Sequence, residues 1–311
     1  MSPAATLEVT GLAAGYGATG RKAGCGSTPV LAGVDFSVPA GACLALVGRS
    51  GCGKSTVLHV LAGLLPPLAG SVTVGGEVVA TADRSCCSAG HAAYMFQRDL
   101  LLPWKTAVQN VALPVRLTAR RGAAGTSGGH RGPGADPEAL EARAGAVLAE
   151  FGLADAIHAT PDELSGGMRQ RVALARTILL DRGLILLDEP FASLDAVTRA
   201  EMRHWLLEVM AAHPATWVLV THDVEEAVLL GDYVAVLHGR PARVDGLRPA
   251  MLDRAVRTQL AAGAVAGDAL DEEPIRELAD MAAGVRALLR PGPSGDVHRI
   301  GRDREELTCK R

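Results

Sequence analysis

Short runs of apolar residues without polar interruptions are the main feature of the hydrophobic pattern along this chain. Four of them, at residues 43–47, 184–187, 217–220 and 233–237, hold four or five consecutive apolar side chains. Such runs are typical of strands that are buried on both faces of a sheet. We therefore predict four central strands, and the first run ends at a glycine, Gly48.

Other segments carry the patterns of exposed strands and of helices. Residues 7–9 and 34–38 alternate between apolar and polar side chains, which indicates half-exposed antiparallel strands. Between residues 57 and 65 the apolar positions recur at helical spacing until Pro66 stops them. Strands and helices thus alternate, and we predict an α/β fold with a mostly parallel core sheet and an antiparallel β edge layer.

Two regions depart from this alternation. Residues 118–137 are rich in Gly, Ala and Arg and have no apolar period, which favours a flexible insertion on the surface. After residue 246 the pattern predicts one amphipathic helix, beginning near Pro274, and a polar, disordered tail after Pro291. We therefore divide the chain into a domain at residues 1–245 and a C-terminal extension at residues 246–311.

Composition excludes several classes of protein. The 311 residues carry a net charge of −3, so a basic, nucleic-acid-binding surface is not expected. The six cysteines follow neither a zinc nor a disulfide spacing, which indicates reduced thiols in a cytosol. There is no secretory signal pattern, and no apolar run approaches the roughly 20 residues that span a bilayer. We expect a soluble chain, or one that is peripheral to a membrane.

The segment GRSGCGKST at residues 48–56 fits the phosphate-binding pattern G-x-x-x-x-G-K-[ST] between a strand and a helix. Its glycines let backbone N–H groups surround phosphates, Lys54 supplies a positive charge, and Ser55 offers a hydroxyl to Mg²⁺. A chance match is disfavoured because the chain has only four lysines. The residues expected to contact the nucleotide are Gly48, Arg49, Ser50, Gly51, Cys52, Gly53, Lys54, Ser55 and Thr56.

Two adjacent carboxylates, Asp188 and Glu189, follow the apolar run at residues 184–187. In an open α/β sheet, ligands bind at the carboxyl ends of the strands. Asp188 fits a position that holds Mg²⁺, and Glu189 fits a general base that orients and deprotonates the attacking water. The alternative is an ordinary strand-to-turn junction whose acids face solvent.

The segment LSGGMRQR at residues 164–171 has the pattern of a helix start. Ser165 can cap the free backbone N–H groups, and Gly166 and Gly167 leave them uncovered. Such a helix N-terminus attracts anions. An ordinary capped helix is the alternative reading.

Together these segments resemble the motifs of the ATP-binding-cassette (ABC) family, and residues 164–171 resemble its signature sequence. The resemblance implies that Gln97 is the Q-loop glutamine, which senses Mg²⁺ and the attacking water. It implies that Asp195 belongs to the D-loop at the dimer interface and that His222 is the switch histidine at the γ-phosphate. It also implies that Tyr16 stacks on adenine, although the neighbouring glycines would equally suit a turn.

The same resemblance implies the assembly. In the family, the signature of one subunit closes over ATP bound in the phosphate loop of a second copy. We therefore expect an ATPase that uses ATP and Mg²⁺, works as a dimer and binds no nucleic acid. Its further partners would be integral membrane permease subunits and, indirectly, a substrate-binding protein. The chain would lie at the cytoplasmic face of the cell membrane as a peripheral subunit.

Residues 96–111, FQRDLLLPWKTAVQNV, resemble the Q-loop region of importer ATPases for nitrate, aliphatic sulfonates and taurine. This segment would open a helical subdomain at about residues 98–164, with Trp104 as an exposed anchor for the permease. Packing of Trp104 inside the subdomain is the alternative.

Other functions remain open. An importer ATPase for a thiamine pyrimidine precursor is one alternative to this group. The Leu-Leu-Pro-Trp run argues against an exporter or a lipoprotein-release ATPase. A single cassette without a basic surface argues against a soluble ABC ATPase of DNA repair or translation.

Overall fold

The computed structural model of the chain describes residues 2–16, 28–82, 90–124, 136–250, 252–266 and 272–289. The tail expected after Pro291 and the middle of the predicted insertion, residues 125–135, lie outside these ranges.

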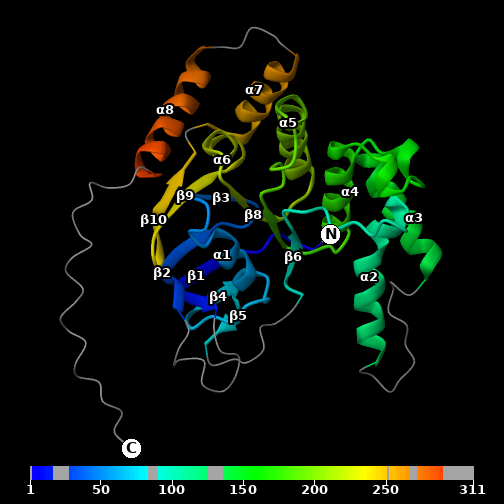
Figure 1. Cartoon of the computed structure of the whole chain (residues 1–311), viewed down its shortest axis with the longest axis horizontal. Coiled ribbons are helices and arrows are strands. Elements are labelled where there is room, and N and C mark those ends of the chain that lie inside the picture. Colours follow the sequence, from blue (N-terminus) through cyan, green and yellow to red (C-terminus); the bar gives the residue numbers. More distant parts are fainter. Residues whose placement is uncertain are drawn as a thin grey trace, which may run out of the picture.

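One sheet contains the ten strands that these ranges form, in the order β5-β4-β1-β2-β10-β9-β3-β8-β7-β6 (Figure 1). The strands are β1 (Leu7–Tyr16), β2 (Thr28–Val38), β3 (Cys43–Gly48), β4 (Ala69–Val74), β5 (Glu77–Thr81), β6 (Ala92–Met95), β7 (Leu184–Asp188), β8 (Thr216–Thr221), β9 (Tyr233–Gly239) and β10 (Ala242–Pro249).

The parallel part of the sheet consists of β9, β3, β8, β7 and β6. Four of these strands are the four predicted apolar runs, and β3, β7 and β8 are buried along their whole length. Because the strands run in one direction, their carboxyl ends meet at one edge, where Gly48, Asp188 and Thr221 lie. The predicted α/β fold with a parallel core is confirmed.

The antiparallel part consists of β5, β4, β1 and β2. The alternating segments predicted β1 and β2, whereas β4 and β5 were not predicted. Strand β10 connects the two parts, since it pairs antiparallel with β9 and makes one parallel pair with β2, Ala242 with Leu31. The predicted domain boundary at residue 245 falls inside β10, so the sheet extends past it.

The described helices pack around this sheet. They are α1 (Lys54–Leu61), α2 (Ala107–Ala124), α3 (Pro137–Glu150), α4 (Gly166–Ile178), α5 (Ala196–Ala212), α6 (Val224–Leu230), α7 (Arg254–Ala266) and α8 (Glu272–Leu289), with short 3₁₀ turns at Ala154–Ala156 and Pro161–Glu163. None of the helices in the described ranges combines the length and the apolar character of a membrane span.

Helices α2, α3 and α4 form a helical unit beside the sheet, at the right of Figure 1. Val111, Leu140, Leu148 and Val172 are buried together there. Helix α2 continues to Ala124, so the first seven residues of the segment predicted as a flexible insertion are helical. The absence of an apolar period there did not prevent the helix, because Ala and Arg are good helix formers.

The C-terminal extension holds two helices where one was expected. Helix α8 is the predicted one, and it packs on α6 through Ala282 and Val285. Helix α7, which was not predicted, buries only Leu260 and Ala261 as apolar residues among its described side chains, and its most buried one is an arginine. Arg257 is 1% exposed, forms an ion pair with Asp232 and donates to the carbonyl oxygens of Leu229 and Gly231.

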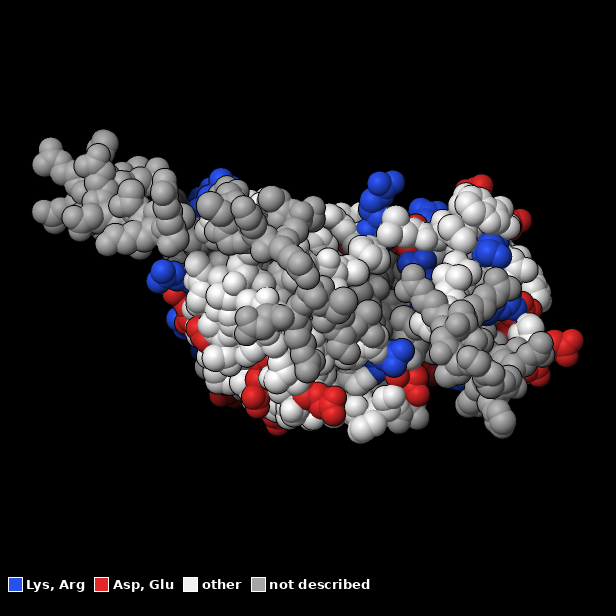
Figure 2. Space-filling model, turned by 90° about the horizontal axis from the view of Figure 1, so that it is seen from below, with Lys and Arg blue, Asp and Glu red and all other residues white. Residues whose placement is uncertain are grey.

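Charges of both signs are interspersed over the described part of the face in Figure 2. Lysine and arginine do not gather into a broad basic field among the side chains that are coloured there. This distribution agrees with the small net charge of −3.

Candidate functional site

The phosphate loop between β3 and α1 is shaped by its glycines. Gly51 and Gly53 have φ angles of +75° and +106°, which favour glycine. A Cβ at Gly53 would lie 2.9 Å from side-chain atoms of Val30 and Leu31, and one at Gly48 would lie 2.7 Å from a backbone oxygen. The loop therefore forms a cradle of backbone without side chains at these positions, which suits close approach of phosphate groups.

Lys54 lies at the start of α1 and is 5% exposed. Its Nζ donates to the carbonyl oxygens of Gly48, at 2.8 Å, and Arg49, at 3.4 Å. No ion pair joins it to a carboxylate in the described part of the chain. A buried ammonium group without an anionic partner is costly, so the position fits an anionic ligand such as a phosphate.

Asp188 ends β7 and is 7% exposed. Its Oδ1 accepts a hydrogen bond from Ser55 Oγ at 3.2 Å, and its Oδ2 accepts one from the Tyr94 hydroxyl at 2.9 Å. A hydroxyl and a carboxylate are hard oxygen ligands, the kind that Mg²⁺ prefers. The described residues hold no group of three or more His, Cys, Asp or Glu side chains that could bind a metal ion together. Mg²⁺ fits this site, since it is usually held by one or two carboxylates together with substrate phosphates.

Tyr94 on β6 is a member of this site that sequence reasoning missed. Burial and the neighbouring Asp188 raise the pKa of its phenol, so the hydroxyl stays protonated and donates to the carboxylate. The available signal was its position in an apolar strand three residues before Gln97, but only the pairing of β6 with β7 brings it to Asp188.

Three of the expected catalytic residues, Glu189, Gln97 and His222, lie within hydrogen-bond distance of one another through Glu189. Its Oε2 accepts hydrogen bonds from Gln97 Nε2 at 3.3 Å and from His222 Nδ1 at 3.1 Å. A carboxylate oxygen only accepts, so Nδ1 of His222 carries the proton of that bond. The three residues come from β6, β7 and β8, each just beyond the carboxyl end of its strand.

The backbone at Glu189 is held in an uncommon conformation. Its φ is 46°, in the left-handed region, and its N–H donates to the carbonyl oxygen of Val220 at 2.8 Å. Such a conformation costs about 1–3 kcal/mol in a non-glycine residue, and residues held in it cluster at functional sites. This conformation argues against an ordinary strand-to-turn junction.

The signature segment begins α4, as its pattern predicted. Ser165 Oγ accepts the N–H of Met168 at 3.2 Å. A Cβ on Gly166 would lie 3.3 Å from Leu194, and one on Gly167 would lie 3.1 Å from Thr198. The helix start thus packs against the Asp195 region of the same chain. No hydrogen bond or ion pair between described residues joins residues 165–167 to the phosphate loop.

Asp195 caps α5. Its carboxylate accepts the N–H groups of Val197 and Thr198, both at 3.1 Å. The hydrogen bonds with Thr198 lower the pKa of this carboxyl, so it is ionised at neutral pH.

Tyr16 lies at the end of β1, and its side chain is 53% exposed. The Tyr16 hydroxyl is 3.0 Å from His59 Nδ1 and accepts from Thr56 Oγ1 at 3.4 Å. These bonds connect the ring to α1 and leave much of its surface open, as an aromatic platform for a base requires.

A loop beside the helical unit presents Trp104, which is 73% exposed. The packing of Trp104 inside the helical unit, the alternative weighed above, is therefore wrong. Asn110 of α2 is fully buried; it accepts the N–H of Leu102 and donates to the carbonyl oxygens of Leu102 and Lys105. Arg176 of α4 donates to the carbonyl oxygen of Leu100 at 2.9 Å. These hydrogen bonds from α2 and α4 hold the loop, and the indole of Trp104 faces solvent.

Comparison with known proteins gives one consistent result. The family model described as "ABC transporter" matches residues 31–192. An aliphatic sulfonates import ATP-binding protein of Mesorhizobium japonicum is 44% identical over 214 residues, which cover 68% of this chain and 71% of the relative. One from Burkholderia ambifaria is 40% identical over 266 residues, 81% of this chain and 73% of the relative.

Solved structures agree with the sequence matches. A dimeric ATP-binding cassette in a post-hydrolysis state, bound to ADP and Pi, superposes with a TM-score of 0.61 at 25% identity. A dimeric bacterial ABC transporter cassette gives a TM-score of 0.61 at 26% identity. Each match covers 79% of this chain and 100% of the solved one.

Proposed function

This chain belongs to the ABC transporter family of ATPases, and we propose that it is the ATP-hydrolysing subunit of an importer for aliphatic sulfonates. The observation that carries the catalytic part is the carboxylate of Glu189, which accepts hydrogen bonds from both Gln97 and His222. The cargo is supported by the relatives, which are aliphatic sulfonate import proteins at 40–44% identity.

We propose that the phosphate loop and Lys54 bind the triphosphate of ATP. The backbone N–H groups of residues 48–56 and the Nζ of Lys54 would donate hydrogen bonds to the phosphate oxygens. The buried ammonium group of Lys54 would then have an anionic partner. Ser55, Asp188 and Gln97 would hold Mg²⁺. When bound, Mg²⁺ neutralises charge that develops on the phosphate oxygens.

Glu189 is the proposed general base. Its Oε2 accepts hydrogen bonds from two side chains, which orient the carboxylate. An ionised carboxylate can orient a water molecule and accept its proton as the water attacks the γ-phosphate. His222 and Gln97 therefore position the base, and a nucleotide that draws either side chain away would change its orientation.

The proposed active unit is a dimer in which each signature completes the ATP site of the other copy. Ser165 to Gly167 form the start of α4, where the first backbone N–H groups have no partner within the helix, and among the described residues no hydrogen bond joins them to the phosphate loop. Val197, beside Asp195, is 71% exposed, so an apolar surface is available at the D-loop. The solved relatives with the same fold are dimers, which supports this arrangement.

Trp104 is the proposed anchor for the permease. A rigid indole that is 73% exposed, beside Leu100 at 48%, suits a groove on a partner protein. A subunit that binds there would lie against the cytoplasmic face of the membrane, and a separate substrate-binding protein would deliver the cargo to the permease.

Growth tests the proposed cargo. A strain that lacks this gene should fail to grow on alkanesulfonates as sole sulfur source, and the native gene should restore growth. The Lys54→Ala gene should not restore it, since ATP hydrolysis needs the buried ammonium. Normal growth of the deletion strain on sulfonates, with loss on taurine, nitrate or without a thiamine pyrimidine precursor, would contradict the proposed cargo.

A further inference from the structure

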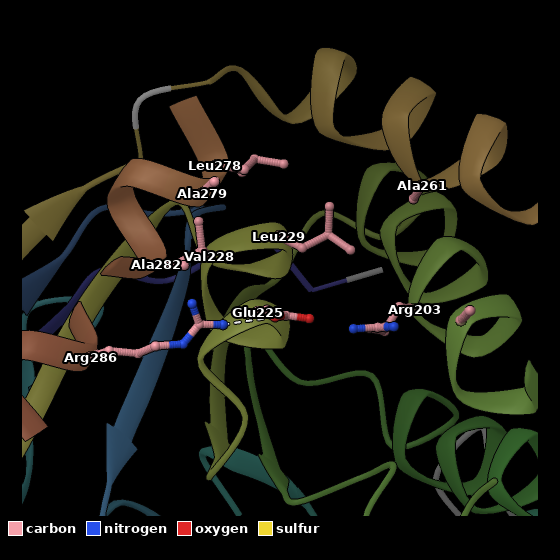
Figure 3. Close-up of a pocket in the computed structure, with 10 residues that line it drawn as sticks. Arg203, Glu225, Val228, Leu229, Ala261, Leu278, Ala279, Ala282 and Arg286 are labelled. Carbon is pink, nitrogen blue, oxygen red and sulfur yellow. Dashed lines mark hydrogen bonds and ion pairs between the residues drawn. The ribbon is translucent and has the colours of Figure 1, made fainter. Parts of the chain in front are cut away.

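A cavity lies where the C-terminal extension meets the ATPase core. Its volume is about 310 Å³, and its walls come from α5, α6, α7 and α8 (Figure 3). Val228, Leu229, Leu278 and Ala282 give it an apolar interior. Small-molecule sites have volumes of about 300–1,000 Å³ and mostly apolar linings with a few polar groups. The cavity has the size and the composition of such a site.

Three charged side chains surround one side of this cavity. Arg286 of α8 donates to Glu225 of α6 at 2.7 Å, and Arg203 of α5 points toward Glu225 from the opposite side (Figure 3). Arg203 forms no ion pair within 4.0 Å among the described residues. Two guanidinium groups and one carboxylate line the cavity, so its lining carries a net positive charge. The carboxylate of Glu226, which is outside the lining, also interacts electrostatically with Arg203.

We propose that this cavity binds a small organic anion with a short aliphatic tail, such as a medium-chain carboxylate or sulfonate. The head group would meet Arg203, since Glu225 already satisfies Arg286. The tail would fill the space between Leu229 and Leu278, which offers no polar partner. A cation is disfavoured because the one carboxylate in the lining is already paired.

Such a ligand would contact both the core and the extension. Helix α5 begins after Asp195 and α6 begins after Asp223, the neighbour of His222. The bound molecule would therefore connect α8 with two helices whose first turns adjoin the proposed ATP site.

Titration calorimetry on the full chain tests the proposal with hexanoate, hexane-1-sulfonate, hexan-1-ol and hexylammonium. Both anions should bind, the alcohol about tenfold more weakly, and the amine not at all. Hexanoate carries the head charge without being a sulfonate, so its binding does not depend on the proposed cargo.

Three variants locate the binding. Arg203→Gln should weaken hexanoate binding about tenfold, and Ala279→Phe, which fills the cavity from an exposed position, should abolish it. Arg276→Gln, an exposed position of α8 outside the cavity, should bind as the native chain does. Circular dichroism would verify that each variant is folded. Equal affinity for the alcohol and the anions, or native affinity in Arg203→Gln and Ala279→Phe, would overturn the proposal.

Discussion

At the scale of single residues, the proposed catalytic edge depends on a few hydrogen bonds to two carboxylates. Asp188 and Glu189 are adjacent in sequence, yet they accept hydrogen bonds from different partners. Asp188 accepts from Ser55 and Tyr94. Glu189 accepts from Gln97 and His222. The residue types and their order predicted most of this set. Tyr94 and the left-handed backbone of Glu189 could not be predicted, because both depend on how neighbouring strands align.

Tyr94→Phe tests whether the phenol positions Asp188. Removing the hydroxyl deletes one hydrogen bond to a carboxylate, worth about 1.5–3 kcal/mol, without changing the shape of the ring. We expect kcat to fall about tenfold, and the Mg²⁺ concentration that gives half-maximal activity to rise. ATPase assays over a Mg²⁺ titration measure both values. Tyr233→Phe, on β9, is the matched control and should behave as the native chain; an unchanged Mg²⁺ dependence in Tyr94→Phe would refute the role.

Glu226 on α6 provides a prediction about pH. Its side chain is buried, and burial is the largest cause that raises the pKa of this carboxyl, with Asp223 adding to it. Thr221 donates to Glu226 at 2.7 Å, and Arg199 and Arg203 oppose the shift.

A raised pKa means that the folded chain binds this proton more tightly than the unfolded chain. The contribution of Glu226 to stability is therefore full below the ordinary glutamate pKa, 4.5, and is lost as pH rises through the higher folded pKa. In Glu226→Gln, the free energy of unfolding should fall less between pH 4.5 and 7 than in the native chain. Urea denaturation across this range measures the slope, and identical slopes for the two proteins would show that the group does not titrate this way.

At the scale of elements, periodicity predicted the buried central strands, missed β4, β5, β6 and β10, and predicted only one of the two helices of the C-terminal extension. Uninterrupted apolar runs became β3, β7, β8 and β9, because strands buried on both faces need apolar residues at every position. The apolar pattern did not predict α7, since Arg257, a charged residue, occupies its most buried described position. A buried ion pair is a tertiary feature that hydrophobic patterns do not reveal.

Asp232→Asn should release α7 from the core. The substitution keeps the shape of the side chain but leaves the charge of Arg257 buried without its anion, and it removes the partner of Arg254. Breaking a buried pair in this way costs about 3–5 kcal/mol. Chemical denaturation and limited proteolysis within residues 252–266 would report the change. Asp280→Asn, an exposed position on α8, makes the same chemical change and should have no effect; equal stability of both variants would contradict this account.

At the scale of the whole molecule, the sheet edge assembles one half of the proposed ATP site, and the start of α4 presents the other proposed half elsewhere. The phosphate loop, Asp188 and Glu189 meet at the carboxyl ends of the parallel strands. Ser165 and the two glycines after it pack against the Asp195 region instead. The helix and strand patterns predicted both segments, and the resemblance to the ABC family implied that they belong to one ATP site. Their separation within one chain is consistent with a site that a second copy completes.

The most direct test of this account is the mass of the Glu189→Gln variant in solution, measured by light scattering with ATP and Mg²⁺. Removing the proposed base prevents hydrolysis, so the ATP-bound dimer should persist at twice the mass of one chain. Adding Ser165→Arg, which blocks the signature but leaves the phosphate loop intact, should give a single-chain mass with ATP still bound. A Glu189→Gln variant that stays at the mass of one chain in ATP, or a double variant that still dimerises, would contradict the shared ATP site.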